Sequence, residues 1–143
     1  MRCKELSFEG KVYMGRILHG QDLINSLQTI VGELGISLGR IEGIGALERA
    51  TVGYYDQILH EYKWIQIEHP MEVLSLQGNI SLKDGVPFVH AHLVLGNEKG
   101  KCFGGHAGEG CRVFAFEYII FPFSGPALER CLDKDTELYL WKI

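Results

Sequence analysis

Hydrophobic positions along the chain follow two different periods. Between residues 21 and 34 they recur at the three- and four-residue spacing of a helix with one buried face, and Gly35 follows where a left-handed C-terminal cap is expected. Elsewhere hydrophobic and polar residues alternate, as in strands with one buried face. The pattern predicts one long helix and strands at 3–8, 11–18, 40–46, 48–56, 61–68, 73–82, 87–95, 112–121, 128–132 and 137–141.

The strand over residues 73–82 has the cleanest alternation. One face is predicted to carry Leu74, Leu76, Ile80 and Leu82, and the other Ser75, Gln77, Asn79 and Ser81. An Asp84-Gly85 pair then predicts a tight turn into the strand over 87–95. We therefore expect an α+β fold, a mostly antiparallel β-sheet with one long flanking α-helix, built as a single domain over residues 1–143.

Composition and charge exclude several classes of protein. The 143 residues are 46% hydrophobic with a net charge of −4, which excludes a disordered chain. The longest apolar run, residues 118–123, is far shorter than the roughly 20 residues of a membrane helix. A charged N-terminal segment and four cysteines without a CxxC pair predict a cytoplasmic protein with reduced thiols. No run of basic residues is present, which disfavours nucleic acid as a partner.

Three of the six histidines, His90, His92 and His106, lie within seventeen positions. The first two fall on the polar face of the strand over 87–95, about 6.6 Å apart and pointing the same way. Two imidazoles placed like this can bind one metal ion, and His106, on a predicted flexible turn after two glycines, can supply a third ligand. If the strands over 73–82 and 87–95 pair, the polar face of the first lies beside these histidines.

The histidine pair alone does not establish a metal site, because about 0.25 such pairs are expected by chance in a chain of this composition. Partly buried histidines hydrogen-bonded at a subunit contact are the alternative. A rival ligand set is Cys102, His106 and Cys111, although its spacing is wider than that of a zinc ribbon or knuckle. Glu109 is either the nearest candidate acid or base or a solvated charge in the glycine-rich segment 96–110, which is predicted to be a loop.

Five segments occur in the order found in a known family: GIGAL (43–47), TVGYYD (51–56), EVLSLQGNI (72–80), PFVHAH (87–92) and GGH (104–106). Over residues 12–141 the chain resembles the PPC domain, the plants and prokaryotes conserved domain. The resemblance implies an antiparallel sheet with a flanking helix, assembled as a homotrimer. Its prokaryotic members look like single-domain proteins of unassigned activity, and several of them carry a metal on three histidines. These correspond here to His90, His92 and His106.

Other relatives bear on the function that the resemblance implies. Plant relatives join the domain to AT-hooks and act in the nucleus, but this chain has no Arg-Gly-Arg-Pro core, so their DNA binding is not implied here. The fold is also similar to that of acetolactate decarboxylase, which holds zinc through three histidines, and we use this only as an analogy. Ala107 stands where the family commonly has a larger aliphatic residue, which either widens the space beside the metal or has no effect.

These observations leave three hypotheses for function. The first is a homotrimeric binding module that holds Zn²⁺ on three histidines and takes a small anionic ligand at an open position, because a structural zinc normally has four protein ligands. The second is a zinc-dependent lyase or hydrolase in which Glu109 moves protons, although the sequence offers no dedicated acid or base. The third is a DNA-associated module like the plant relatives, which conflicts with the net charge of −4.

Overall fold

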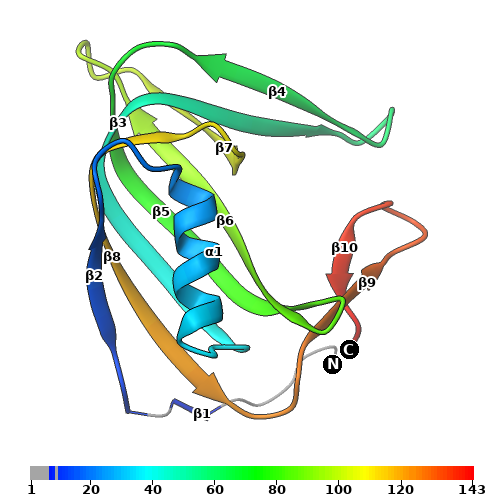
Figure 1. Ribbon diagram of the computed structural model, residues 1–143. Helices are drawn as coiled ribbons and strands as arrows, with labels where there is room; N and C mark the ends of the chain where they lie inside the picture. Colours follow the sequence, from blue (N-terminus) through cyan, green and yellow to red (C-terminus); the bar gives the residue numbers. More distant parts are fainter. Residues whose placement is uncertain (1–6, 9) are drawn as a thin grey trace.

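The computed structural model describes residues 7–8 and 10–143, and within them it has one helix and a mostly antiparallel sheet of ten strands (Figure 1). The α+β class is therefore confirmed. No helix among the described residues is both long and apolar enough to cross a bilayer. The elements are β1 (Ser7–Phe8), β2 (Tyr13–Ile17), α1 (Leu23–Glu33), β3 (Gly39–Asp56), β4 (Glu61–Ile67), β5 (Met71–Lys83), β6 (Val86–Gly96), β7 (Cys102–Ala107), β8 (Arg112–Ser124), β9 (Glu129–Leu132) and β10 (Tyr139–Trp141).

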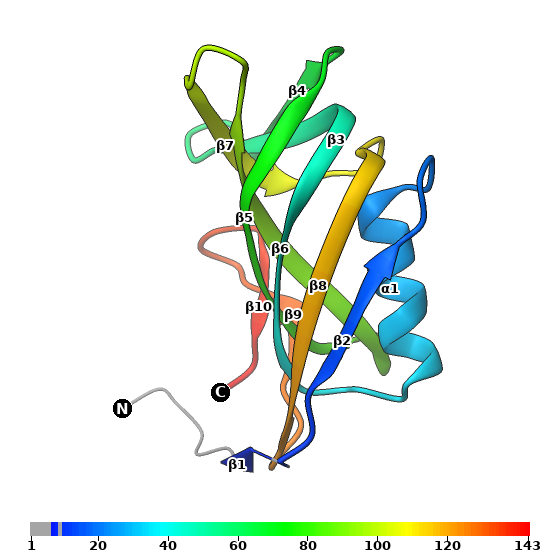
Figure 2. The same ribbon diagram turned by 90° about the vertical axis from the view of Figure 1, so that its left-hand side faces the viewer.

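Helix α1 lies against one face of the sheet (Figure 2). It begins after Asp22, whose carboxylate accepts a hydrogen bond from the backbone N–H of Asn25 and so caps the helix. Gly35 adopts the predicted left-handed conformation, with φ +65°. The residues that α1 buries are Leu23, Leu27 and Val31. The hydrophobic period thus predicted both the extent and the buried face of the helix.

Strand β3 is one strand of 18 residues, where the sequence predicted two. Its first half pairs with β5 and β8, and its second half pairs with β4 and β7. The pairing register shifts between Gly43 and Gly45 and again around Leu47. Such bulges break the alternation of apolar and polar residues without ending the strand, which is why the pattern resembled two strands. The long strand carries the β3–β4 hairpin beyond the rest of the sheet (Figure 1).

Strand β7 corrects a second prediction, because it lies inside the segment 96–110 that was expected to be a loop. It pairs with β6 on one side and with β3 on the other, so His106 lies on a strand rather than on a flexible turn. A Cβ on Gly104 would lie 2.7 Å from the Leu93 carbonyl oxygen, and one on Gly105 would lie 2.6 Å from that of Gly53. These glycines permit close packing of neighbouring strands, a role that sequence alone does not distinguish from a turn.

The β5–β6 hairpin confirms most of the predicted faces. It turns at Asp84 and Gly85, with φ of +54° and +74°, as expected for an Asp-Gly turn. One residue of β5 departs from the prediction: Leu74 is 51% exposed, because a register shift between Val73 and Ser75 rotates it out of the core. In β6 the predicted apolar face is buried over Val89, Ala91, Leu93 and Leu95.

The two faces of the sheet differ in what covers them. The face that α1 covers, here called the inner face, holds the hydrophobic core, which includes Phe116, Ile120, Leu76 and the buried side chains of β6. The opposite face is here called the outer face. Because directly opposed residues of an antiparallel sheet project to the same side, the strand register defines one row on the outer face: Met14, Ile119, Glu42, Gln77, His92 and His106.

Candidate metal centre

The structure brings together the three histidines that the sequence singled out. His90 and His92 project from β6 to the outer face, and His106 of β7 lies directly opposite His92. The ring centroids are 5.2 Å apart for His90 and His92, 5.0 Å for His90 and His106, and 5.4 Å for His92 and His106. One nitrogen of each ring lies within 4.8 Å of the other two. The three side chains therefore converge from two adjacent strands.

The electrostatic environment keeps two of these rings neutral. Burial lowers the pKa of His90 to about 4, and the charges of Arg130 and of the neighbouring histidines act in the same direction. Burial also lowers the pKa of His106 to about 4, with further contributions from His92 and Arg130. Neutral imidazole is the form that binds metal ions, so both rings have a lone pair available at pH 7.

A buried nitrogen in the cluster lacks a partner. Nδ1 of His106 is buried and has no hydrogen-bond partner among the described residues. Such a group costs roughly 1–3 kcal/mol when it stays unsatisfied. A metal ion, or a group that a bound ion orders, would satisfy it. Imidazole suits zinc, copper, iron and nickel, so the donor set fits a transition metal.

Aromatic side chains of β4 support His106. The rings of Tyr62 and Trp64 stack with centroids 5.3 Å apart, and they lie 5.0 and 6.1 Å from the His106 centroid. In the strand register Gly53 lies between Trp64 and His106, and a Cβ there would come within 2.9 Å of both aromatic rings. Because Gly53 has no side chain, the rings of Tyr62 and Trp64 can extend across β3 toward His106. The sequence reasoning gave these aromatics no role; a glycine inside a strand was the available signal.

Arg130 of β9 is buried beside the histidines, with 7% of its surface exposed. Its Nε donates to Ser81 Oγ at 2.9 Å, its Nη1 to the Tyr139 carbonyl at 3.0 Å, and its Nη2 to Asn79 Oδ1 at 2.6 Å. Nη2 also lies 3.5 Å from His90 Nδ1, at the outer limit of a hydrogen bond. These contacts fix the guanidinium at the edge of the histidine cluster.

The sequence predicted some of these neighbours and missed others. Gln77 and Asn79 lie directly opposite His92 and His90, as the predicted pairing of the two strands required. Arg130 was placed on a strand without a functional role. The local pattern gave no signal for its burial, because, of its two apolar neighbours two residues away, Leu128 is buried whereas Leu132 is 57% exposed.

The rival ligand set is wrong. Cys111 is fully buried in the inner core, where its thiol contacts the backbone of Thr51, and burial raises the pKa of that thiol to about 11. Cys102 is exposed at the start of β7, four residues or about 13 Å along the strand from His106. Among the described residues, the group positioned to hold a metal contains only histidines.

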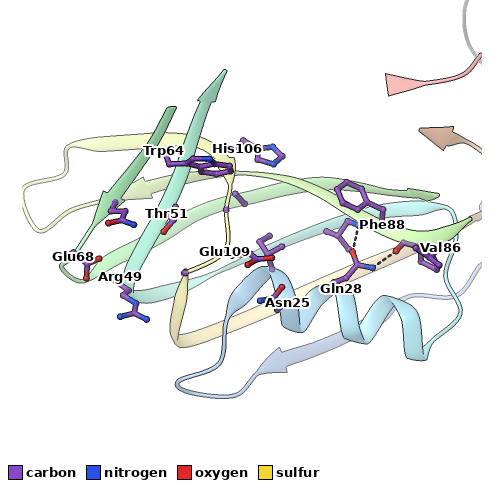
Figure 3. A pocket seen from close by; sticks show the side chains of 17 residues that line it. Asn25, Gln28, Arg49, Thr51, Trp64, Glu68, Val86, Phe88, His106 and Glu109 are labelled. Atoms are coloured by element: carbon purple, nitrogen blue, oxygen red, sulfur yellow. Dashed lines mark hydrogen bonds between the residues drawn. The ribbon is translucent and has the colours of Figure 1, made fainter. Parts of the chain in front are cut away.

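Glu109 lies beyond the end of β7 and is exposed. With His106, Trp64 and Gln28 it lines a cleft of about 960 Å³ between α1 and the β3–β4 hairpin (Figure 3). Its role as an acid or base stays a prediction. Ala107 is 5% exposed and packs against the inner core, and it also lines this cleft beside His106. The effect of its small side chain on the space beside the histidines stays a prediction.

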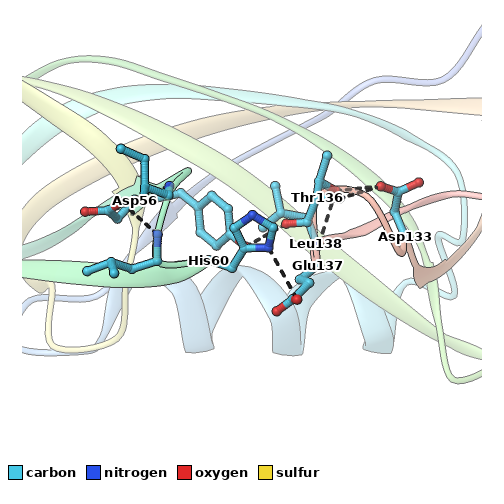
Figure 4. A network of polar contacts seen from close by, with 9 residues as sticks. Asp56, His60, Asp133, Thr136, Glu137 and Leu138 are labelled. Atoms are coloured by element: carbon cyan, nitrogen blue, oxygen red, sulfur yellow. Dashed lines mark hydrogen bonds and ion pairs between the residues drawn. The ribbon is translucent and has the colours of Figure 1, made fainter.

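Polar contacts tie together the two hairpins that flank the cluster (Figure 4). The hydroxyl of Tyr55, near the tip of the β3–β4 hairpin, donates to the Thr136 carbonyl at 2.6 Å. His60 Nδ1 lies 3.4 Å from a carboxylate oxygen of Glu137. Thr136 and Glu137 belong to the segment between β9 and β10. The hairpin that carries Trp64 is thus connected to the hairpin that carries Arg130.

Comparison with known proteins identifies the family. The profile of the Plants and Prokaryotes Conserved (PCC) domain, the PPC family named above, matches residues 6–124. The chain belongs to the PCC family. The metal-containing protein AF0104 from Archaeoglobus fulgidus is 42% identical, with a TM-score of 0.91 over 99% of this chain and 100% of that one. A PPC protein from Pyrococcus horikoshii is 39% identical, with a TM-score of 0.92 over 100% and 98% of the two chains.

More distant similarities add less. A Bacteroides thetaiotaomicron protein, whose name proposes DNA binding, has a TM-score of 0.86 over 96% of both chains at 24% identity, which shows the fold alone. The bifunctional protein GlmU of Synechococcus sp. (strain JA-3-3Ab) is 31% identical over 111 residues, which are 77% of this chain and 17% of that protein. The chain thus matches only about a sixth of the length of its curated relatives.

Proposed function

We propose that the protein is a zinc-binding member of the PCC family, in which His90, His92 and His106 hold the ion and a fourth position takes a small anionic ligand. The convergence of the three rings carries this proposal. The neutral state of His90 and His106 and the unpartnered Nδ1 of His106 support it. So does the description of AF0104 as metal-containing. Three neutral imidazoles leave the ion dipositive, which favours an anion at the open position.

Elemental analysis of the purified protein tests the proposal. We expect about one zinc per chain, and we expect His90→Ala/His92→Ala to lose it, because only one imidazole of the cluster remains. The matched control is His69→Ala, an exposed histidine of the β4–β5 connection, which should keep its zinc. Zinc retained in the double variant would refute the assignment of the site.

We further propose a homotrimer of single-domain chains in the cytoplasm. Exposed apolar side chains on the outer face support self-association; they are Met14 (75% exposed), Ile44 (59%), Leu74 (51%) and Val94 (45%). Light scattering should give three times the chain mass of 16.1 kDa. Ile44→Glu should lower that mass, since it places a charge among the apolar side chains that are proposed to lie between the subunits. A monomeric mass for the unaltered protein would contradict the trimer.

A zinc-dependent lyase or hydrolase is the second candidate, favoured by a set of three protein ligands where a structural site would have four. A bound ion would supply a Lewis acid and lower the pKa of bound water to roughly 7. Glu109, in the cleft that reaches His106, would then hold or move a proton. A panel of esters and 2-keto acids should show turnover that a chelator removes and that Glu109→Gln reduces. No turnover across the panel would favour the binding module.

DNA binding is the third candidate. Names that propose it for proteins of the same fold from Bacteroides thetaiotaomicron and Ralstonia eutropha do not clearly fit our sequence analysis, which disfavours nucleic acid as a partner. Those proteins are 24% and 21% identical to this chain, and its net charge is −4. We expect no mobility shift with duplex DNA. A shift that weakens as salt rises would favour this function instead.

A further inference from the structure

Arg130 is a buried cation without a matching anion. Among the described residues no carboxylate lies within ion-pair distance of its guanidinium. Its partners are the uncharged oxygens of Ser81, Asn79 and Tyr139 and the rings of Phe88 and Trp141, each centred 5.6 Å from Cζ. A buried charge is costly unless it is paired, and these partners supply no opposite charge. A dication on the neighbouring histidines would increase the imbalance.

The hydrogen-bond count shows where an anion would lie. A guanidinium has five N–H groups, and three of those of Arg130 donate to Ser81, Asn79 and Tyr139. Of the two that remain, one is on Nη2, the nitrogen 3.5 Å from His90 Nδ1. If His90 binds metal through Nε2, its Nδ1 carries a hydrogen; if it binds through Nδ1, that lone pair is used. In both cases Nη2 needs another acceptor beside the ion.

A second cation lies at the same edge of the cluster. The Lys83 ammonium is 4.1 Å from the Tyr139 ring centroid and 5.4 Å from that of Phe88, and no carboxylate pairs with it among the described residues. Phe88 is thus flanked by Lys83 and Arg130 on one side of the histidines, while Trp64 and Tyr62 border the other side. The surroundings are cationic and aromatic, which suits a small organic anion.

We propose that Arg130 is the anion-binding residue of this site and that the ligand is a small carboxylate, which shares its two oxygens between the metal ion and the guanidinium. The proposal rests on the proposed metal site. A carboxylate matches the site because it needs few donors and its carbon substituent can lie against the aromatic rings. Inorganic phosphate presents more charge and more acceptor oxygens than two spare N–H groups can satisfy.

Cobalt-loaded protein provides the test, since Co²⁺ prefers the same ligands as zinc and its visible spectrum reports the coordination sphere. Bound cobalt per chain is measured first, and acetate or phosphate is then titrated into the unaltered protein and into Arg130→Met, Arg130→Lys and Arg112→Met. Arg112 is the matched control because its guanidinium is already paired with Glu48 at 2.6 Å. Arg130→Lys keeps the positive charge, so it still tests the proposal if Arg130→Met does not fold.

We expect all four proteins to bind about one cobalt per chain and acetate to shift the spectrum of the unaltered protein. The acetate concentration that gives half of the spectral shift should rise at least about tenfold in Arg130→Met and by an intermediate factor in Arg130→Lys. It should be unchanged in Arg112→Met. Equal acetate affinity in the Arg130 variants, or a tight response to phosphate without one to acetate, would overturn the inference while leaving the metal site intact. Failure of the unaltered protein to bind cobalt would show, before any anion is added, that the proposed function itself is wrong.

Discussion

The two faces of strand β6 carry different kinds of side chain, apolar residues on one and the clustered histidines on the other. On the inner face Val89, Ala91, Leu93 and Leu95 are buried in the core. On the outer face His90 and His92 contact each other and His106 of β7, and His90 also contacts Arg130 of β9. Apolar contacts on the inner face need only the right volume, whereas the outer face needs particular atoms at particular places. Stability and metal binding should therefore separate between neighbouring residues of one strand.

Leu93→Ala should have the largest effect on stability. Leu93 is 1% exposed, and its truncation leaves a cavity between the sheet and its neighbours in the core. Such substitutions lower the free energy of unfolding by about 2–5 kcal/mol. Urea unfolding of the metal-free protein measures the loss, while the zinc content of the folded fraction should stay at one per chain. A loss below about 1 kcal/mol would mean that the inner face is packed less tightly than the structure shows.

His92→Ala, one residue away, should have the opposite profile. Its side chain is exposed, so the metal-free protein should unfold within about 0.5 kcal/mol of the unaltered protein. Metal affinity should fall more than about 100-fold, because removing a group that merely orients a ligand already costs about 10–100-fold. Competition with a chelator of known affinity measures this. Unchanged metal affinity would show that His92 is not a ligand. A large loss of stability in the metal-free protein would show that the outer face of β6 also contributes to folding.

Gly53→Ala should affect both properties moderately. The added Cβ would come within 2.9 Å of the Tyr62 and Trp64 rings that lie against His106. Overpacking of this kind costs about 1–3 kcal/mol, and displaced rings should also weaken metal binding. The matched control is Gly32→Ala on α1, where nothing lies within 4 Å and alanine should stabilise by about 0.5–1 kcal/mol. If both variants behave alike, the aromatic support of His106 has no energetic weight.

What the sequence could predict of the fold depends on how far apart along the chain the interacting residues lie. The helix, its glycine cap, the Asp-Gly turn and the buried face of β6 follow from signals within a few residues of one another. The continuity of β3 and the strand β7 depend on pairing with distant segments. A bulge and a glycine-rich strand both break the local pattern, and for this reason one strand was predicted as two and another as a loop.

For the candidate site, the predicted residues were those with a distinctive local pattern. His90 and His92 alternate on one strand, His106 follows nearby after two glycines, and the family resemblance implied the same three residues. Arg130 and Trp64 were missed because they reach the cluster from β9 and β4, segments between 20 and 45 residues away along the chain. An arginine on a short strand has the same local pattern whether it is exposed or buried. Arg130 is buried only because the β9–β10 hairpin packs against β5.

The most direct test of the account is X-ray diffraction from crystals of the purified protein, recorded above and below the zinc absorption edge. We predict one anomalous peak per chain, about 2.0–2.1 Å from one nitrogen of each of His90, His92 and His106. The absence of a peak among these rings, with the three imidazoles pointing apart, would contradict the proposed metal site and the carboxylate site built on it.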